Sequence, residues 1–306
     1  MNEFRIQERL MGSAFELIIL HTDADEAQRL LQAGLNEIKR IEHLLSEFRP
    51  DSEISIINRN AGKTAVKVCH EVFSLIERCL SISNATKGSF DINMGALKKI
   101  YKFNNTDFEF PSKAVVKSTL QNVGSDKIKL NKQKKEVLLD TEDMALSFAA
   151  IGKGYAADCV RMMWLAEGVQ SGVISASGDL TTIGYNREGK PWTIGIANPD
   201  KAEEMLFYIP VENAAVATSG DYMQYFMHNG IRYSHNINPL NGMPVTGVKS
   251  VSVFSKAAEL ADALATAVYV MGPETGLHFI ELLPDTHCII IDANNNIHCS
   301  KNILLN

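Results

Sequence analysis

The stretch GVISASGDLTTI, residues 172–183, decides the fold class of this chain, because a Gly-Asp turn interrupts a run of strand-forming residues. More strand patterns follow, and only two helical patterns, at 258–271 and 274–283, interrupt them. Strands in clusters with few intervening helices favour antiparallel pairing. We therefore expect an α+β fold with largely antiparallel sheets packed with helices, and not a doubly wound sheet. The other predicted strands of this half lie at 192–197, 206–211, 214–218, 250–254 and 287–292.

The N-terminal half combines a strand with several helices. Residues 13–20 alternate in polarity, and Asp23 then begins a long helix as its N-cap, with Glu26 at capping-box spacing. Apolar residues recur every three or four positions up to about Phe48. No repeat or proline-rich linker marks a boundary, so one domain over 1–306 is expected. Further helices are predicted at 71–83, after Pro111 and at 152–167, and short strands at 127–130 and 137–140.

The composition is that of an ordinary globular protein, with 45% hydrophobic and 22% charged residues and a net charge of -6. An acidic balance gives no reason to expect nucleic acid or an anionic membrane as a partner. No segment approaches the about eighteen apolar residues of a membrane span. The five cysteines are odd in number and include no C-x-x-C pair, which favours reduced thiols in the cytoplasm. A removed leader sequence would leave the same pattern, so the compartment stays open.

The segment ELADALATAVYVMG places Asp262 and Thr266 four residues apart on one predicted helix. Side chains at this spacing lie on one face, about 5–6 Å apart at Cβ. Mg²⁺ binds oxygen ligands at about 2.1 Å, so one ion can be held by both side chains. The alternative is a solvated aspartate beside a packing threonine, which is the commoner outcome for an isolated D-x-x-x-T pattern.

The segment SFAAIGKGYAAD places Lys153 between two glycines where a helix begins. A helix N-terminus offers unpaired N–H groups, and glycines allow a phosphate to approach closely. The pattern is not a Walker A loop, because Gly154 stands where that loop needs Ser or Thr. The sequence therefore leaves an anion site and a tight packing turn as alternatives.

The segment YSHNINPLNGMP places His235 where a strand runs into a tight turn. The ordinary histidine pKa of about 6.5 suits a general base at neutral pH, although most lone histidines have no such role. Three further elements, GSFDI at 88–92, SGDL at 177–180 and TSGDY at 218–222, end or interrupt strand-like runs. Such elements make turns, and they can also line a nucleotide pocket.

Taken together in chain order, these segments resemble the ApbE-like FAD:protein FMN transferases, a family formerly named thiamine biosynthesis lipoproteins. The resemblance covers nearly the whole chain, and eight ordered blocks are far more specific than any one of them. Besides SGDL and TSGDY, the blocks are MGSAFEL at 11–17, FRPDSEISIIN at 48–58, GSFDINMGAL at 88–97, AAIGKGYAAD at 149–158, SHNINPLNGMP at 234–244 and SVSVFSKAAELADALATAVYVMG at 250–272.

The resemblance implies a T-fold-like architecture and a Mg²⁺-dependent reaction in which FMN from FAD is joined to a Thr or Ser hydroxyl of an acceptor flavoprotein and AMP is released. It implies a metal site at Asp262 and Thr266, with the backbone carbonyl of Ala150. His235 is the implied base, and Lys153 supports the breaking phosphoanhydride. The implied contacts with the flavin nucleotide are Met11, Phe48, Ser89, Phe90, Asp91, Ser147, Lys153 and Ile237.

The chain departs from the family pattern at four positions. Ser147 and Asn238 stand where the family usually has Asp, Asn93 where it favours Thr, and Ser177 where it has Gly. The two missing carboxylates lower the negative charge expected near the ion. Two other functions stay open: an FAD pyrophosphatase that releases free FMN and AMP, and a non-catalytic FAD-binding protein. The identity of the acceptor and the oligomeric state cannot be read from the sequence.

Overall fold

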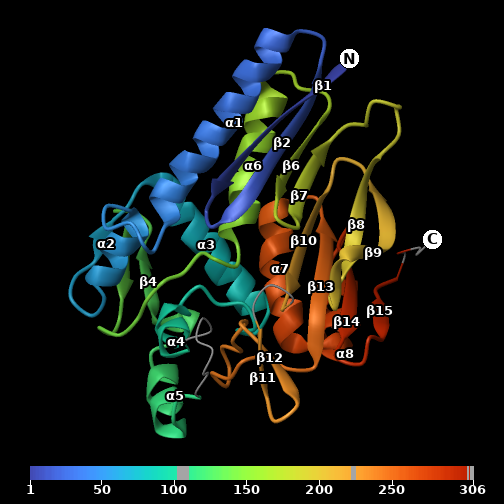
Figure 1. Ribbon diagram of the computed structural model, residues 1–306. Helices are drawn as coiled ribbons and strands as arrows, with labels where there is room; N and C mark the ends of the chain where they lie inside the picture. The colour runs from blue at the N-terminus through green and yellow to red at the C-terminus, as the bar shows by residue number, and fades with distance from the viewer. Residues whose placement is uncertain (102–109, 222–224, 302, 304–306) are drawn as a thin grey trace.

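An eight-stranded antiparallel sheet forms the frame of the computed structural model, which describes residues 1–101, 110–221, 225–301 and 303. Its strand order is β1-β2-β6-β7-β10-β13-β14-β15, so both ends of the chain contribute strands (Figure 1). Every pairing in it is antiparallel, which confirms the predicted α+β class. The strands are β1 (Asn2–Leu10), β2 (Ser13–His21), β6 (Gly172–Ala176), β7 (Asp179–Ile183), β10 (Ala215–Gly220), β13 (Val248–Ser255), β14 (His287–Asp292) and β15 (Ile297–Cys299).

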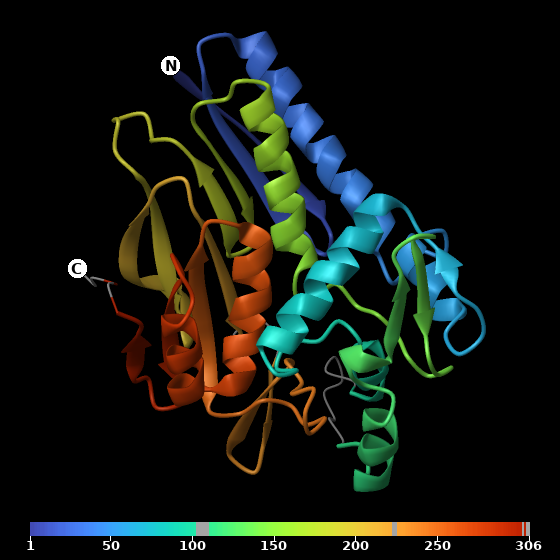
Figure 2. The ribbon, with the colours of Figure 1, turned by 180° about the vertical axis from the view of Figure 1, so that it is seen from behind.

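Three helices lie side by side across one face of this sheet, as Figure 2 shows. They are α1 (Ala24–Leu45), α6 (Gly152–Ala166) and α7 (Ala258–Met271). The apolar stripe of α1 packs on β2 and α6, and its leucines and isoleucines are buried in the larger of the hydrophobic clusters. A second cluster joins α7 to β13 and β14 and includes the fully buried Tyr269. The burial of these apolar faces positions the N-terminal ends of α6 and α7 against each other.

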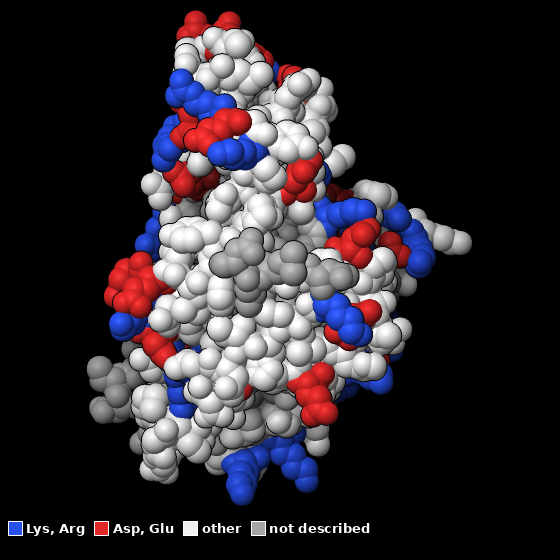
Figure 3. Space-filling view, turned by 90° about the vertical axis from the view of Figure 1, so that its right-hand side faces the viewer, with Lys and Arg blue, Asp and Glu red and all other residues white. Residues whose placement is uncertain are grey.

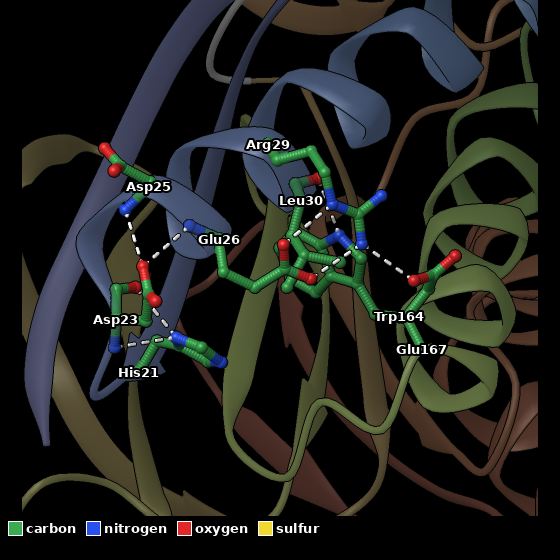
Figure 4. A network of polar contacts seen from close by, with 8 residues as sticks. All are labelled: His21, Asp23, Asp25, Glu26, Arg29, Leu30, Trp164 and Glu167. Carbon is green, nitrogen blue, oxygen red and sulfur yellow. Dashed lines mark hydrogen bonds and ion pairs between the residues drawn. The ribbon is translucent and has the colours of Figure 1, made fainter.

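The start of α1 shows the predicted cap in altered form (Figure 4). The Asp23 carboxylate accepts hydrogen bonds from the backbone N–H groups of Asp25 and Glu26, at 2.9 and 3.1 Å. The Glu26 side chain does not accept the backbone N–H of Asp23, because its carboxylate accepts hydrogen bonds from Nε and one terminal nitrogen of Arg29. His21 accepts the Asp23 N–H instead, so one half of the expected capping box is replaced.

Two contacts in the same region tie α1 to α6 (Figure 4). The indole N–H of the buried Trp164 donates to the backbone carbonyl of Leu30 at 3.0 Å. Arg29 also reaches Glu167, just past the end of α6. The exposed ion pair contributes little, but the buried indole bond fixes how the two helices lie along each other.

Shorter elements surround this frame. A three-stranded sheet has the order β3-β5-β4, and two hairpins are formed by β8 with β9 and by β11 with β12. The bounds of these elements are α2 (Glu53–Arg59), β3 (Val66–Lys67), α3 (His70–Ala85), α4 (Gly95–Ile100), α5 (Lys113–Leu120), β4 (Ile128–Asn131), β5 (Glu136–Leu139), β8 (Trp192–Asn198), β9 (Lys201–Val211), β11 (Tyr225–His228), β12 (Ile231–Ser234) and α8 (Pro273–Glu281), with a 3₁₀ turn at Ser125–Lys127.

Several elements differ from the sequence prediction. Strand β1 is unpredicted because it is a polar edge strand whose residues alternate between exposed and half-buried. The helix expected to reach Phe48 ends at Leu45, since Ser46 adopts an extended backbone and accepts the N–H of Phe48. The first residues of β9 were not predicted because they are charged, and α2, β3, α4, β11 and β15 were also missed.

The charged side chains on one face of the molecule are mixed in sign. On the face shown in Figure 3, acidic and basic side chains are interspersed around a broad uncharged area. Within the described parts of the chain, no helix is both long and apolar enough to cross a membrane.

Candidate active site

A cavity of about 290 Å³ lies where the N-terminal ends of α6 and α7 meet the turn between β6 and β7. Nine of the predicted site residues line it: Ser89, Asp91, Ser147, Ala150, Lys153, His235, Ile237, Asp262 and Thr266. These residues are spread over almost 180 positions of sequence. The remaining lining residues are Ser13, Met94, Lys98, Ala149, Ser177, Asp179, Thr218, Ser219, Gly220, Asn236 and Pro239.

The close contact between α6 and α7 depends on Gly154. A Cβ at this position would lie 2.2 Å from the carbonyl oxygen of Ala258 and 2.9 Å from the Cβ of Asp262. Only glycine allows the two helices to approach this far. The approach lets the backbone N–H of Gly154 donate to the Asp262 carboxylate at 3.1 Å. The glycine predicted to admit a phosphate therefore also seats the presumed metal ligand.

Lys153 joins two buried carboxylates in this corner. Its Nζ lies 2.6 Å from Oδ2 of Asp179 and 3.5 Å from Oδ2 of Asp262. Burial lowers the pKa of Lys153, but the two carboxylates outweigh that effect and raise it. Burial raises the pKa of Asp262, Lys153 lowers it and Asp179 raises it, and the net direction is upward. Two carboxylates and one ammonium leave the corner one negative charge in excess.

Asp179 is a site residue that the sequence analysis did not single out. It follows the two-residue turn between β6 and β7, in which Ser177 and Gly178 both have positive φ. Ser177 tolerates φ 50° while its hydroxyl bonds to the backbone of Ala14 on β2. Oδ1 of Asp179 accepts the N–H of Thr218 at 3.0 Å, which aims Oδ2 at Lys153. An acidic residue directly after a Ser-Gly turn was the available sequence signal.

The oxygen donors of the presumed metal site share this cavity. Asp262 and Thr266 occupy one face of α7, as their spacing predicts. The Thr266 hydroxyl lies 3.2 Å from the hydroxyl of Ser219 on β10, which belongs to the TSGDY element. Ala150 lies in the turn that precedes α6 and lines the same space. Asp262, Thr266 and Ala150 therefore line one cavity.

A second wall is built from segments outside regular structure. Ser89 and Asp91 lie between α3 and α4, and the backbone N–H of Asn93 donates to Asp91 at 2.7 Å. Burial raises the pKa of Asp91 to about 6, and backbone hydrogen bonds from Asn93 and Ser125 oppose that rise. Phe90 points away from the cavity into the hydrophobic core and is fully buried.

Ser147 belongs to a chain of polar contacts on this wall. Its hydroxyl accepts a hydrogen bond from Nζ of Lys98 at 2.9 Å and donates to Oε1 of Glu47 at 2.9 Å. The carboxylate expected at position 147 is therefore replaced by a hydroxyl that connects a lysine to a neighbouring glutamate. Neither Lys98 nor Glu47 was predicted, because Lys98 follows the GSFDINMGAL block and Glu47 stands at the end of the helix that was expected to reach Phe48.

His235 follows β12 and precedes a tight turn, as predicted. The turn is closed by hydrogen bonds between Asn238 and Met243 and between Gly242 and Asn238. The Asn238 side chain accepts the N–H of Leu240, so it stabilises the turn. The turn thereby brings His235, Asn236 and Ile237 to the lining of the cavity.

Three predicted flavin contacts lie outside the cavity lining, namely Met11, Phe48 and the buried Phe90. Met11 lies in the turn between β1 and β2, where its N–H donates to Glu42, and its side chain is next to Gly152 at the start of α6. Phe48 is 89% exposed. With Phe90, these residues stay predictions as nucleotide contacts. Tyr222 of the TSGDY element lies outside the described residues.

The fold and the site define a class of protein. An antiparallel α+β frame, a helix N-terminus with a lysine and an oxygen-lined cavity together make an enzyme site suited to an anionic ligand. Within that class the chain belongs to the ApbE family, whose model matches residues 11–290.

Individual relatives agree with this membership. An FAD:protein FMN transferase from Klebsiella pneumoniae strain 342 is 30% identical over 95% of this chain and 90% of its own length. One from Vibrio cholerae is 27% identical over 89% of this chain and 82% of its own length. The crystal structure of an ApbE protein from Thermotoga maritima superposes with a TM-score of 0.91 at 28% identity, over 98% of this chain and 97% of the other.

Proposed function

We propose that this chain is a Mg²⁺-dependent transferase that moves FMN from FAD to a Thr or Ser hydroxyl of an acceptor protein and releases AMP. The convergence of Asp262, Thr266 and Lys153 on one cavity carries this proposal. The relatives named FAD:protein FMN transferase support the same reaction for this chain.

The residues of the cavity fit a magnesium ion. Mg²⁺ prefers oxygen ligands, and Asp262, Thr266 and Ala150 offer a carboxylate, a hydroxyl and a carbonyl. The corner has more carboxylates than ammonium groups, so a divalent cation complements its charge. When bound there, Mg²⁺ would neutralise charge on the diphosphate as the phosphoanhydride breaks.

The other residues bind the substrate and move a proton. The positive end of the α6 dipole and the Lys153 ammonium attract the diphosphate of FAD. His235 takes the proton of the acceptor hydroxyl, whose oxygen attacks the phosphorus of the FMN half. The bond between that phosphorus and the bridging oxygen breaks, and AMP leaves with the bridging oxygen.

The test is incubation with FAD, Mg²⁺ and a panel of candidate acceptor proteins, followed by mass spectrometry of the acceptors and chromatography of the nucleotides. We expect an acceptor heavier by one FMN group and an equal amount of AMP. Free FMN with unmodified acceptors would show hydrolysis instead. If the FAD is recovered unchanged, the chain binds FAD without catalysing a reaction.

A further inference from the structure

Lys98 on α4 is a cavity lysine that the proposed reaction does not use. Its Nζ donates to the Ser147 hydroxyl, and that hydroxyl donates to Glu47. Lys153 in the same cavity is paired with two carboxylates. Among the described contacts, the Lys98 ammonium donates to a neutral hydroxyl. Its positive charge therefore remains available to an anion in the cavity.

The two lysines act on the same space. Part of the Lys98 side chain is exposed, but desolvation at the cavity lowers its pKa, Glu47 raises it, and Lys153 lowers it. Both lysines line the same cavity, so their like charges repel each other there. An anion bound between them would remove that repulsion and would receive charge-assisted hydrogen bonds. The diphosphate is the anionic part of FAD.

We propose that Lys98 is a second lysine contact for the FAD diphosphate, and that Ser147 and Glu47 are positioning residues that orient its ammonium. This inference rests on the proposed function, because it takes FAD as the ligand. The Glu47 carboxylate draws the Ser147 proton toward itself, which leaves the lone pairs of that hydroxyl for Lys98.

The first experiment compares FAD with riboflavin, which lacks phosphate, in binding titrations without acceptor. We expect Lys98→Met to weaken FAD binding about tenfold, equivalent to about 1.4 kcal/mol, and to leave riboflavin binding unchanged. Lys98→Arg should restore most of the FAD affinity. Lys99→Met is the matched control, because Lys99 is exposed like Lys98 on the same helix but lines a separate hollow with Asn58.

The second experiment tests the positioning residues by adding a competing carboxylate. Ser147→Asp places an anion beside the Lys98 ammonium, so FAD should bind several-fold more weakly, and Glu47→Gln should weaken it by less. In the Lys98→Met background, Ser147→Asp should lose most of its effect on FAD affinity. Urea unfolding midpoints of each variant show that it is folded.

The outcomes separate the two proposals. A wild-type chain that does not bind FAD would overturn the proposed function. A wild-type chain that binds FAD while Lys98→Met binds it equally well would overturn only the role of Lys98. Equal losses of FAD and riboflavin affinity in Lys98→Met would also overturn that role, because they would show a general effect on the cavity.

Discussion

The two walls of the cavity are built in different ways. One wall takes Lys153, Asp179 and Asp262 from the ends of α6, β7 and α7, which are anchored in the core. The other takes Ser89, Asp91 and Ser147 from segments outside regular structure. The first wall concentrates charge in fixed geometry, whereas the second supplies polar contacts from irregular backbone. We propose that the cation site belongs to the first wall and that the second wall contributes ligand fit, and the variants below test that division.

The largest effect is expected at Asp262. Asp262→Ala and Asp262→Asn should each lower FMN transfer at least about 100-fold, because both remove the charge that holds the cation. Asp262→Asn is the sharper variant, since its amide oxygen can still accept the N–H of Gly154. Transfer is measured by mass spectrometry of the acceptor at saturating Mg²⁺. Near wild-type turnover in Asp262→Asn would contradict the assignment of Asp262 as a metal ligand.

A substitution at Gly154 tests how rigid the first wall is. Gly154→Ala forces a methyl group against the Ala258 carbonyl, so α6 and α7 must separate. We expect a loss of about 3 kcal/mol in the free energy of unfolding, measured with urea. Gly152→Ala is the control two residues earlier, where the atom nearest to a Cβ would be the flexible end of Met11 at 3.3 Å. Equal stabilities of the two variants would contradict the close packing.

The pH dependence of stability tests the second wall, because Asp91 is a buried titratable residue there. Its pKa is about 6 when folded and about 3.8 when unfolded, so between these values the folded state holds more protons. The Asp91 contribution therefore makes stability fall as pH rises through this window, by about 2 kcal/mol. Asp91→Asn should flatten that decline in urea unfolding from pH 4 to 7. Some slope will remain, because burial also raises the pKa of Asp221 to about 6. If the free energy of unfolding changes with pH equally in the variant and the wild type, the raised pKa of Asp91 is contradicted.

The smallest change in stability is expected at Phe48. Phe48→Ala should alter unfolding by less than about 0.5 kcal/mol, because the side chain is 89% exposed. If Phe48 contacts the flavin, the same variant should bind FAD several-fold more weakly in a fluorescence titration. Leu282→Ala, at an exposed position past the end of α8, is the control and should change neither quantity. Unchanged FAD affinity in Phe48→Ala would exclude this contact.

Sequence patterns were most informative where regular structure carries the site. The four-residue spacing of Asp262 and Thr266 placed both on one helical face, and the glycines around Lys153 marked the start of α6. Patterns were least informative in loops. Ser147 could be named only by resemblance, and its partners Lys98 and Glu47 lie 49 and 100 residues away. Hydrophobic periodicity reports on one element at a time and contains nothing about such pairings.

The sequence by itself determined the antiparallel α+β class, the helix that carries Asp262 and Thr266, and membership of the family, because each depends on local period or on ordered motifs. Its prediction of one domain over 1–306 remains a prediction. Only the tertiary structure decided that Asp179 joins Lys153 and Asp262, and that Phe90 points into the core. The packing of α6 against α7 at Gly154 sets those charge pairs, and that packing is a property of the whole fold.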